Sequence, residues 1–151
     1  MIIQPITPKD RAWLGEFFQK TWGSSQIFLP EGVYNALDLK GFYTEDHHHI
    51  LTYTETAIAT LNFDTPDSGT AFLNLCLSQL PTPLNAYSTN DNLDNIQVLQ
   101  RAGFTLDHIF KGAVDDARIE NPNIPNIGKY GIPIRDEIRL VYDKVHDEHS
   151  N

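Results

Sequence analysis

The stretch "STNDNLDNIQVLQRAGF", Ser88–Phe104, decides the fold of this 151-residue chain. Apolar residues recur in its second half at the spacing of one helical face, and Gly-Phe closes the pattern. Asn92 suits the N-cap of such a helix, and Asp94 suits its first turn, because helix N-termini favour negative charge. A β-like run, "LNAYST", precedes the helix and another, "FTLDHIFKG", follows it. The stretch therefore predicts a strand–helix–strand unit of an α/β fold.

The N-terminal part of the chain predicts one long helix. Thr7, Pro8 and Asp10 have the N-cap, first-turn proline and third-position acid that are typical of a helix start. The following "KDRAWLGEFFQKTWG" carries aromatic residues at helical spacing, which indicates a core-facing stripe. The next segment, "LPEGVYNALDLK", is mixed and is expected to be a short helix or a loop.

The middle of the chain changes to a β pattern. Residues 41–64 form β-like runs with very short connections, so we expect an antiparallel meander. An apolar helix, "TAFLNLCLSQL", should follow and end at the next prolines. Beyond the decisive stretch, "AVDDARIENPNIPNIGKYGIP" is expected to be long and irregular, with a helical turn at its start. "RDEIRLVYDK" predicts a last strand. This order predicts an α/β fold with a mixed, mostly antiparallel sheet flanked by helices.

The bulk composition is that of one acidic globular domain. We expect a single domain over residues 1–146 and a frayed tail over residues 147–151. The net charge of −9 argues against non-specific binding to nucleic acid or to an anionic membrane. The lone Cys76 cannot form an internal disulfide and is expected to be buried. No signal peptide or membrane span is predicted, so we expect a cytoplasmic protein, and a homodimer remains an open alternative.

Three segments resemble the GNAT superfamily of N-acetyltransferases. "NLDNIQVLQRAGF", Asn92–Phe104, resembles the family's strand–helix–strand motif, in which an Asn opens the helix and Gly-Phe closes it. "TPDSGTAFL", Thr65–Leu73, resembles a worn Q/R-x-x-G-x-G/A turn, which in the family receives the pyrophosphate of acetyl-CoA. "GKYGIPIRDEIRL", Gly128–Leu140, is similar to the tail of one bacterial GNAT subgroup, which follows a similar "TTNDN" segment. The resemblance implies a GNAT-like, acyl-CoA N-acyltransferase fold.

The resemblance also implies a function and a co-substrate. The implied activity is acetyl transfer from acetyl-CoA to an amine of a small molecule or peptide. A glycine turn before a helix offers backbone N–H groups and a positive dipole end to a pyrophosphate. The preceding strand would donate an N–H to the thioester, and the asparagine junction would face the thioester end. The implied cofactor contacts are Leu61, Phe63, Ser68, Gly69, Thr70, Ala71, Asn90, Asn92 and Asn95.

Three departures from the family pattern favour an alternative function. Pro66 stands where the family has Gln or Arg, and Asp67 places a negative charge near the expected pyrophosphate. Leu99 aligns with the family's proton-donating tyrosine and cannot donate a proton. The alternative is a degenerate, non-catalytic GNAT fold that serves as a binding or interaction module.

The general base is not identified by the sequence. In the implied mechanism a neutral amine attacks the thioester while a base accepts its proton. Glu55, Asp64 and Glu137 are candidates by position, and a solvated or paired carboxylate is the alternative interpretation of each. The resemblance implies that Arg135, Asp136 and Glu137 help to shape the acceptor pocket. An edge strand with outward charges is the alternative.

The run His47-His48-His49 raises a metal hypothesis. On a strand, only His47 and His49 would share a face, and Glu45 could join them. The alternative is a polar strand end or a tight turn. No second cluster of ligands completes a site, so no metal is predicted.

Overall fold

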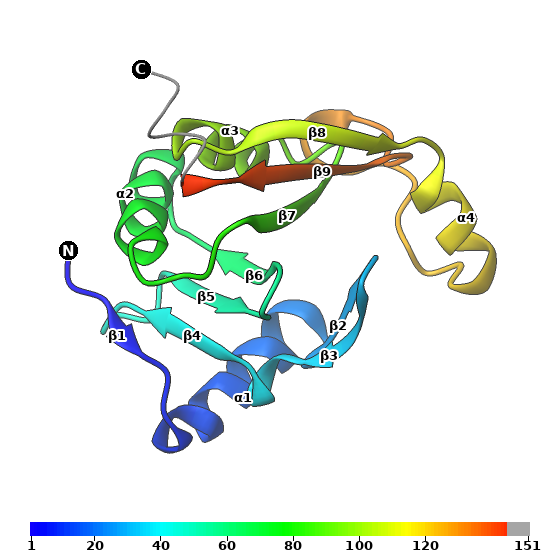
Figure 1. Cartoon of the computed structure of the whole chain (residues 1–151). Helices are drawn as coiled ribbons and strands as arrows, with labels where there is room; N and C mark the ends of the chain where they lie inside the picture. Colours follow the sequence, from blue (N-terminus) through cyan, green and yellow to red (C-terminus); the bar gives the residue numbers. More distant parts are fainter. Residues whose placement is uncertain (145–151) are drawn as a thin grey trace. The chain divides into compact units, whose positions relative to one another are not determined.

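The computed structural model describes residues 1–144 and divides into two compact units, the first spanning Met1–Pro81 and the second beginning at Thr82 (Figure 1). The single-domain prediction stays a prediction, and the predicted tail at 147–151 lies outside the described residues. With η marking 3₁₀ turns, the first unit contains β1 (Gln4–Pro5), η1 (Pro8–Asp10), α1 (Arg11–Trp22), β2 (Gln26–Leu29), β3 (Gly32–Asn35), η2 (Ala36–Asp38), β4 (Lys40–Tyr43), β5 (Ile50–Tyr53), β6 (Ile58–Asn62) and α2 (Pro66–Leu77).

The predicted N-terminal helix is confirmed, and its start is fixed by Asp10. The Asp10 carboxylate accepts hydrogen bonds from Thr7 N, at 2.8 Å, and from Trp13 Nε1, at 2.9 Å. Tyr43 OH on β4 donates to the same carboxylate at 3.1 Å. Burial alone would raise the pKa of Asp10, but these hydrogen bonds outweigh it and lower the pKa below its ordinary value. One side chain thus joins the helix start to the sheet.

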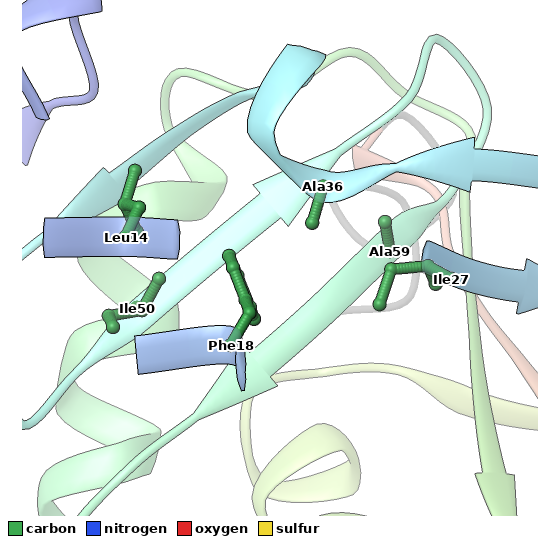
Figure 2. Close-up of a cluster of buried hydrophobic side chains, with 6 residues drawn as sticks. All are labelled: Leu14, Phe18, Ile27, Ala36, Ile50 and Ala59. Carbon is green, nitrogen blue, oxygen red and sulfur yellow. The ribbon is translucent and has the colours of Figure 1, made fainter. Parts of the chain in front are cut away.

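The core of the first unit lies between α1 and the sheet. Leu14 and Phe18 of α1 are almost fully buried against Ile50 of β5 and Ala59 of β6 (Figure 2). Burial of one such aliphatic or aromatic side chain stabilises a fold by about 1.5–3 kcal/mol. The aromatic stripe predicted for the helix is therefore core.

The prediction for "LPEGVYNALDLK" is wrong in its main part. Strands β2 and β3 pair there as an antiparallel hairpin, with Ile27 opposite Tyr34 and Phe28 opposite Val33. Only the short turn η2 is helical. Two four-residue strands have too few positions for a clear period-2 pattern, so sequence periodicity missed them.

The predicted meander is confirmed. Strands β1, β4, β5 and β6 form one sheet in that order, and every pairing is antiparallel. The register of β5 with β6 shifts between Thr52 and Tyr53. Helix α2 then begins at Pro66, with Thr65 as its N-cap, and buries Cys76. Burial raises the pKa of this thiol to about 12, so Cys76 is the inert core residue that was expected.

The second unit contains the decisive strand–helix–strand stretch. Its elements are β7 (Leu84–Thr89), α3 (Leu93–Arg101), β8 (Thr105–Phe110), α4 (Ala113–Glu120), η3 (Lys129–Gly131) and β9 (Glu137–Tyr142). Its sheet has the order β7-β9-β8, so the last strand inserts antiparallel between the other two. The α/β prediction with mostly antiparallel sheets is confirmed, and α4 is a longer helix than the single turn expected.

Candidate functional site

The predicted pyrophosphate turn forms the first turn of α2. Thr65 Oγ1 accepts a hydrogen bond from Ser68 N at 3.1 Å, and Ser68 Oγ accepts one from Thr65 N at 3.0 Å. This reciprocal pair is a capping box. Gly69 N donates to Thr65 O at 2.7 Å, and Pro66 has no N–H. The backbone donors Ser68 N and Gly69 N are therefore already bonded to Thr65. The resemblance to the GNAT turn implies instead that such donors are free for a ligand.

Glycine at position 69 is required by close packing. A Cβ on Gly69 would lie 2.6 Å from Phe63 Cγ, closer than atoms can approach. Of its neighbours in the helix, Thr70 is buried and donates from Oγ1 to Pro66 O at 2.8 Å, whereas Ala71 is exposed. A larger side chain at Gly69 would therefore disturb the packing of α2 on Phe63.

The end of β6 holds a buried acceptor that lacks a donor. Asn62 lies between Leu61 and Phe63, the two residues expected to meet the thioester end of the cofactor. Its Oδ1 atom is buried and has no hydrogen-bond partner within residues 1–144. An unpaired buried acceptor costs a fold about 1–3 kcal/mol, so such atoms usually have an unseen partner, such as a ligand or water.

The three histidines occupy a turn between β4 and β5 and point to different partners. His47 stacks on Trp13 with ring centroids 3.5 Å apart. His48 Nδ1 lies 3.6 Å from Asp46 Oδ2. His49 is buried, and its Nε2 lies 2.9 Å from Ser68 Oγ. The strand arrangement behind the metal hypothesis is wrong, and no group of three ligand residues lies together in the described part of the chain.

His49 links this turn to the helix start. Burial lowers the pKa of His49, while Asp46 and Asp64 act to raise it and His48 acts to lower it. A neutral ring and the Ser68 hydroxyl share one hydrogen bond, in which either atom can donate according to the tautomer. The sequence showed this residue only as one of a histidine run.

In the second unit, the asparagine junction binds the segment before β9. Asn90 Oδ1 accepts hydrogen bonds from Arg135 N at 2.9 Å and Asp136 N at 3.0 Å. Asn90 Nδ2 donates to Pro133 O at 2.9 Å. The "TNDN" and "GIPIRDEI" segments, which carried the most specific part of the resemblance, therefore contact each other.

Asp91 adds a second attachment for the same segment. Its buried carboxylate accepts from Lys129 N at 2.9 Å and from Thr89 Oγ1 at 2.5 Å. A Cβ on Gly128 would lie 2.0 Å from Asp91 Oδ2, so only glycine fits there. Tyr130 OH donates to Asp94 Oδ1 at 2.6 Å. We call these contacts, together with those of Asn90, the junction lock.

The other two asparagines serve the helix. Asn92 Oδ1 accepts from Asn95 N at 3.2 Å, which confirms Asn92 as the N-cap of α3. Asn95 Nδ2 donates to Tyr87 O at 3.5 Å. Leu99 is buried in α3 at 1% exposure, so this position belongs to the core. Cofactor contact by Asn90, Asn92 and Asn95 stays a prediction.

Of the three predicted carboxylates, Glu137 has the environment of a base. It is half-buried at the start of β9, and burial raises its pKa. It pairs in register with Thr89 on β7 and Phe110 on β8. Arg139, two residues on, donates from Nε to Asp107 at 2.7 Å and lies over the Phe110 ring. A partly desolvated carboxylate with a raised pKa is a functional-site candidate.

Glu55 and Asp64 lie at opposite ends of β6. Glu55 is exposed in the turn before this strand, and Asp64 is exposed just after it, 4.0 Å from His48 Nδ1. Neither carboxylate is buried, so neither has the desolvation that Glu137 has.

Comparison with known proteins gives two relatives that cover nearly the whole chain. No family model matches the chain. The uncharacterized Bacillus subtilis protein YxbD is 34% identical in an alignment that covers 89% of this chain and 92% of that protein. The uncharacterized protein YdhI of the same organism is 30% identical in an alignment that covers 97% of this chain and 99% of that protein.

Several solved acetyltransferases share the fold. Ribosomal-protein-alanine N-acetyltransferase from Brucella melitensis has a TM-score of 0.61 at 11% identity, covering 95% of this chain and 99% of its own. A GNAT-family acetyltransferase from Bacillus cereus has a TM-score of 0.60 at 14% identity, covering 95% and 96%. Arabidopsis thaliana NAA60, in complex with acetyl-CoA, has a TM-score of 0.57 at 14% identity, covering 94% and 98%.

Proposed function

This chain belongs to one protein family with YxbD and YdhI and has the GNAT fold, and from this we propose that it is an acyl-CoA-dependent N-acetyltransferase. It transfers acetyl from acetyl-CoA to an amine of a small molecule or peptide. Acetyl-CoA in the Arabidopsis neighbour supports the co-substrate. No helix in residues 1–144 has the length and apolar character needed to cross a membrane. We place the enzyme in the cytoplasm, without a nucleic-acid partner.

The observation that carries the proposal is the unpaired acceptor on β6. The pantetheine arm of acetyl-CoA contains amide N–H groups, and Asn62 Oδ1 is a buried acceptor that needs such a donor. Leu61 and Phe63 flank it, and the backbone N–H expected to polarise the thioester carbonyl lies in the same segment.

Glu137 is the general base in this proposal. The amine nitrogen attacks the thioester carbon, the C–S bond breaks, and the CoA thiolate leaves. Glu137 accepts the proton lost by the amine and returns it to solvent, and solvent protonates the thiolate. A carboxylate with a raised pKa is better matched to this task than an exposed one. Buried Leu99 takes no part.

Calorimetric titration with acetyl-CoA tests the proposal, together with the variant Asn62→Leu. The variant removes the unpaired oxygen at similar volume, so the melting temperature should stay the same or rise. The same change should weaken acetyl-CoA binding about tenfold, because a hydrogen bond to the ligand is lost.

The matched control is Asn74→Leu, at an exposed position of α2, which should leave acetyl-CoA affinity unchanged. Absence of acetyl-CoA binding to the unmodified protein would sink the enzyme proposal. If Asn62→Leu and the unmodified protein bind acetyl-CoA with equal affinity, Asn62 does not contact the cofactor.

The second candidate function is the non-catalytic binding module. It is favoured by the first turn of α2, where Ser68 N and Gly69 N bond within the helix and Pro66 has no N–H. Acetyl-CoA binding without turnover across a panel of amines would support this candidate.

A further inference from the structure

A pocket lies in the first unit, beside the turn that precedes β6. Its volume is about 510 Å³, which suits a small molecule. It is lined mainly by residues of β3, η2, β4 and the turn after β5. Those used below are Tyr34, Asp38, Leu39, Lys40, Tyr53 and Glu55.

The two tyrosine walls of the pocket are held in place. Tyr53 lies opposite Lys40 in the β4–β5 register, and its ring stacks on buried Phe42 with an interplanar angle of 9°. Tyr34 lies opposite Ile27 in the hairpin, and Ile27 is 4% exposed in the core of the unit. The ring of Tyr53 is therefore held by a ring contact, and the backbone of Tyr34 by its pairing in the hairpin.

The hairpin and the turn after β5 are also tied to each other. Thr56 Oγ1 donates a short hydrogen bond to Glu31 Oε1 in the hairpin turn. Within the other turn, Thr54 N donates to Ala57 O at 2.8 Å, and Ala57 N donates to Thr54 Oγ1 at 3.0 Å. Glu55 sits inside this closed turn. Walls that are fixed before binding lower the entropy cost of taking up a ligand.

The charges around the pocket have opposite signs. Asp38 is paired with Arg11, whose Nη1 lies 2.9 Å from Asp38 Oδ1. The side chains of Lys40 and Glu55 have no hydrogen bond or ion pair with any other residue among 1–144. One cation and one carboxylate thus remain available, beside two aromatic rings and the apolar side chain of Leu39.

We propose that this pocket binds a free α-amino acid with a large apolar side chain. The ammonium group of the amino acid pairs with Glu55, and its carboxylate pairs with Lys40. Its side chain lies between the rings of Tyr34 and Tyr53. The site does not depend on acetyl transfer, so it can be tested without acetyl-CoA.

Titration of ¹⁵N-labelled full-length protein with L-phenylalanine tests the site by NMR. The backbone amides of Tyr34, Leu39 and Tyr53 should shift in a saturable manner. N-acetyl-L-phenylalanine lacks the ammonium group and L-phenylalanine amide lacks the carboxylate. Each should bind about fivefold more weakly than phenylalanine, since a partly exposed ion pair is worth up to about that factor.

Two variants test whether Glu55 pairs with the ammonium group of the ligand and Lys40 with its carboxylate. Glu55→Gln should weaken phenylalanine and the amide about fivefold and leave N-acetyl-phenylalanine unchanged. Lys40→Met should weaken phenylalanine and N-acetyl-phenylalanine and leave the amide unchanged. Glu16→Gln and Lys9→Met, at exposed positions near the chain start, are the controls and should change nothing.

Three results would overturn the proposal. The first is the absence of saturable amide shifts at about 10 mM phenylalanine. The second is a set of shifts confined to residues outside the pocket. The third is an equal affinity for phenylalanine in Glu55→Gln, Lys40→Met and the unmodified protein. Circular dichroism melting separates a lost site from a lost fold. Loss of this site would leave acetyl-CoA binding untouched, so the two proposals fail independently.

Discussion

At the scale of single residues, tertiary contacts add to what sequence context predicts. Asn92 caps α3 as expected, and the Asn90 amide also holds the segment before β9, while cofactor contact by the asparagine cluster stays a prediction. Asn62 belongs to no sequence motif, yet its side-chain oxygen is a buried acceptor without a hydrogen-bond partner among the described residues. A side chain's partners are set by tertiary contacts, which no local pattern contains.

The base assignment makes a residue-scale prediction. Glu137→Gln keeps the size of the side chain and removes its ability to accept a proton. We expect kcat for amine acetylation to fall about 10²–10⁴-fold, with the affinity for acetyl-CoA unchanged. Steady-state kinetics over pH and calorimetry measure the two quantities.

Glu16→Gln is the matched comparison for this experiment, because it makes the same change at an exposed carboxylate outside both proposed sites. If both variants lose activity equally, or neither does, Glu137 is not the base. In the active protein, the pH profile of kcat should show a pKa above the ordinary Glu value of 4.5, and Glu137→Gln should lack that step.

At the scale of elements, the first turn of α2 combines two opposing effects. Asp67 lies in that turn, where a negative charge stabilises a helix by about 0.3–1 kcal/mol. The same charge repels any phosphate bound there. At an effective dielectric constant of about 20, two unit charges 4 Å apart repel by about 4 kcal/mol, and salt screens this at an exposed position.

Asp67→Asn should therefore strengthen acetyl-CoA binding while slightly lowering helix stability. At low ionic strength we expect a gain of about threefold to tenfold in affinity, and a smaller gain at about 0.15 M salt. Asp116→Asn makes the same change in the first turn of α4 and should leave affinity unchanged. Equal affinities for Asp67→Asn and the unmodified protein would show that the pyrophosphate binds elsewhere.

At the scale of the whole molecule, the sequence predicts the order of most elements but not the partners of their side chains. Long periodic segments such as α1 and α3 are predicted with their caps, because periodicity and capping are local properties. The β2–β3 hairpin is missed because it is short. The junction lock is missed because its halves lie 36 to 46 residues apart.

The stability of the protein should fall in two stages as the pH decreases. Burial lowers the pKa of His49 below 6.5, so its contribution is present above pH 6.5 and is lost as the pH falls through the folded-state pKa. The pKa of Asp10 in the folded state is below the ordinary value of 3.8, so Asp10 adds stability above pH 3.8. This stability is lost as the pH falls through the folded-state pKa of Asp10. Glu137, with a raised pKa, acts in the opposite direction.

Urea unfolding of the unmodified protein and His49→Gln between pH 7.5 and 4.5 isolates the first stage. The variant should lack it, and the control His48→Gln, at an exposed position, should keep it. A first stage that survives in His49→Gln would assign it to another group.

The junction lock also has a consequence for the order of folding. Asn90 and Pro133 are 43 residues apart, and Asp91 and Lys129 are 38 apart. Their bonds are gained only after the chain between them has lost its loop-closure entropy, which makes such contacts slow to form. We expect pulsed hydrogen exchange during refolding to show the amide of Lys129 gaining protection after those of α3. The segment that most resembles a known family would thus be among the last to reach its native place.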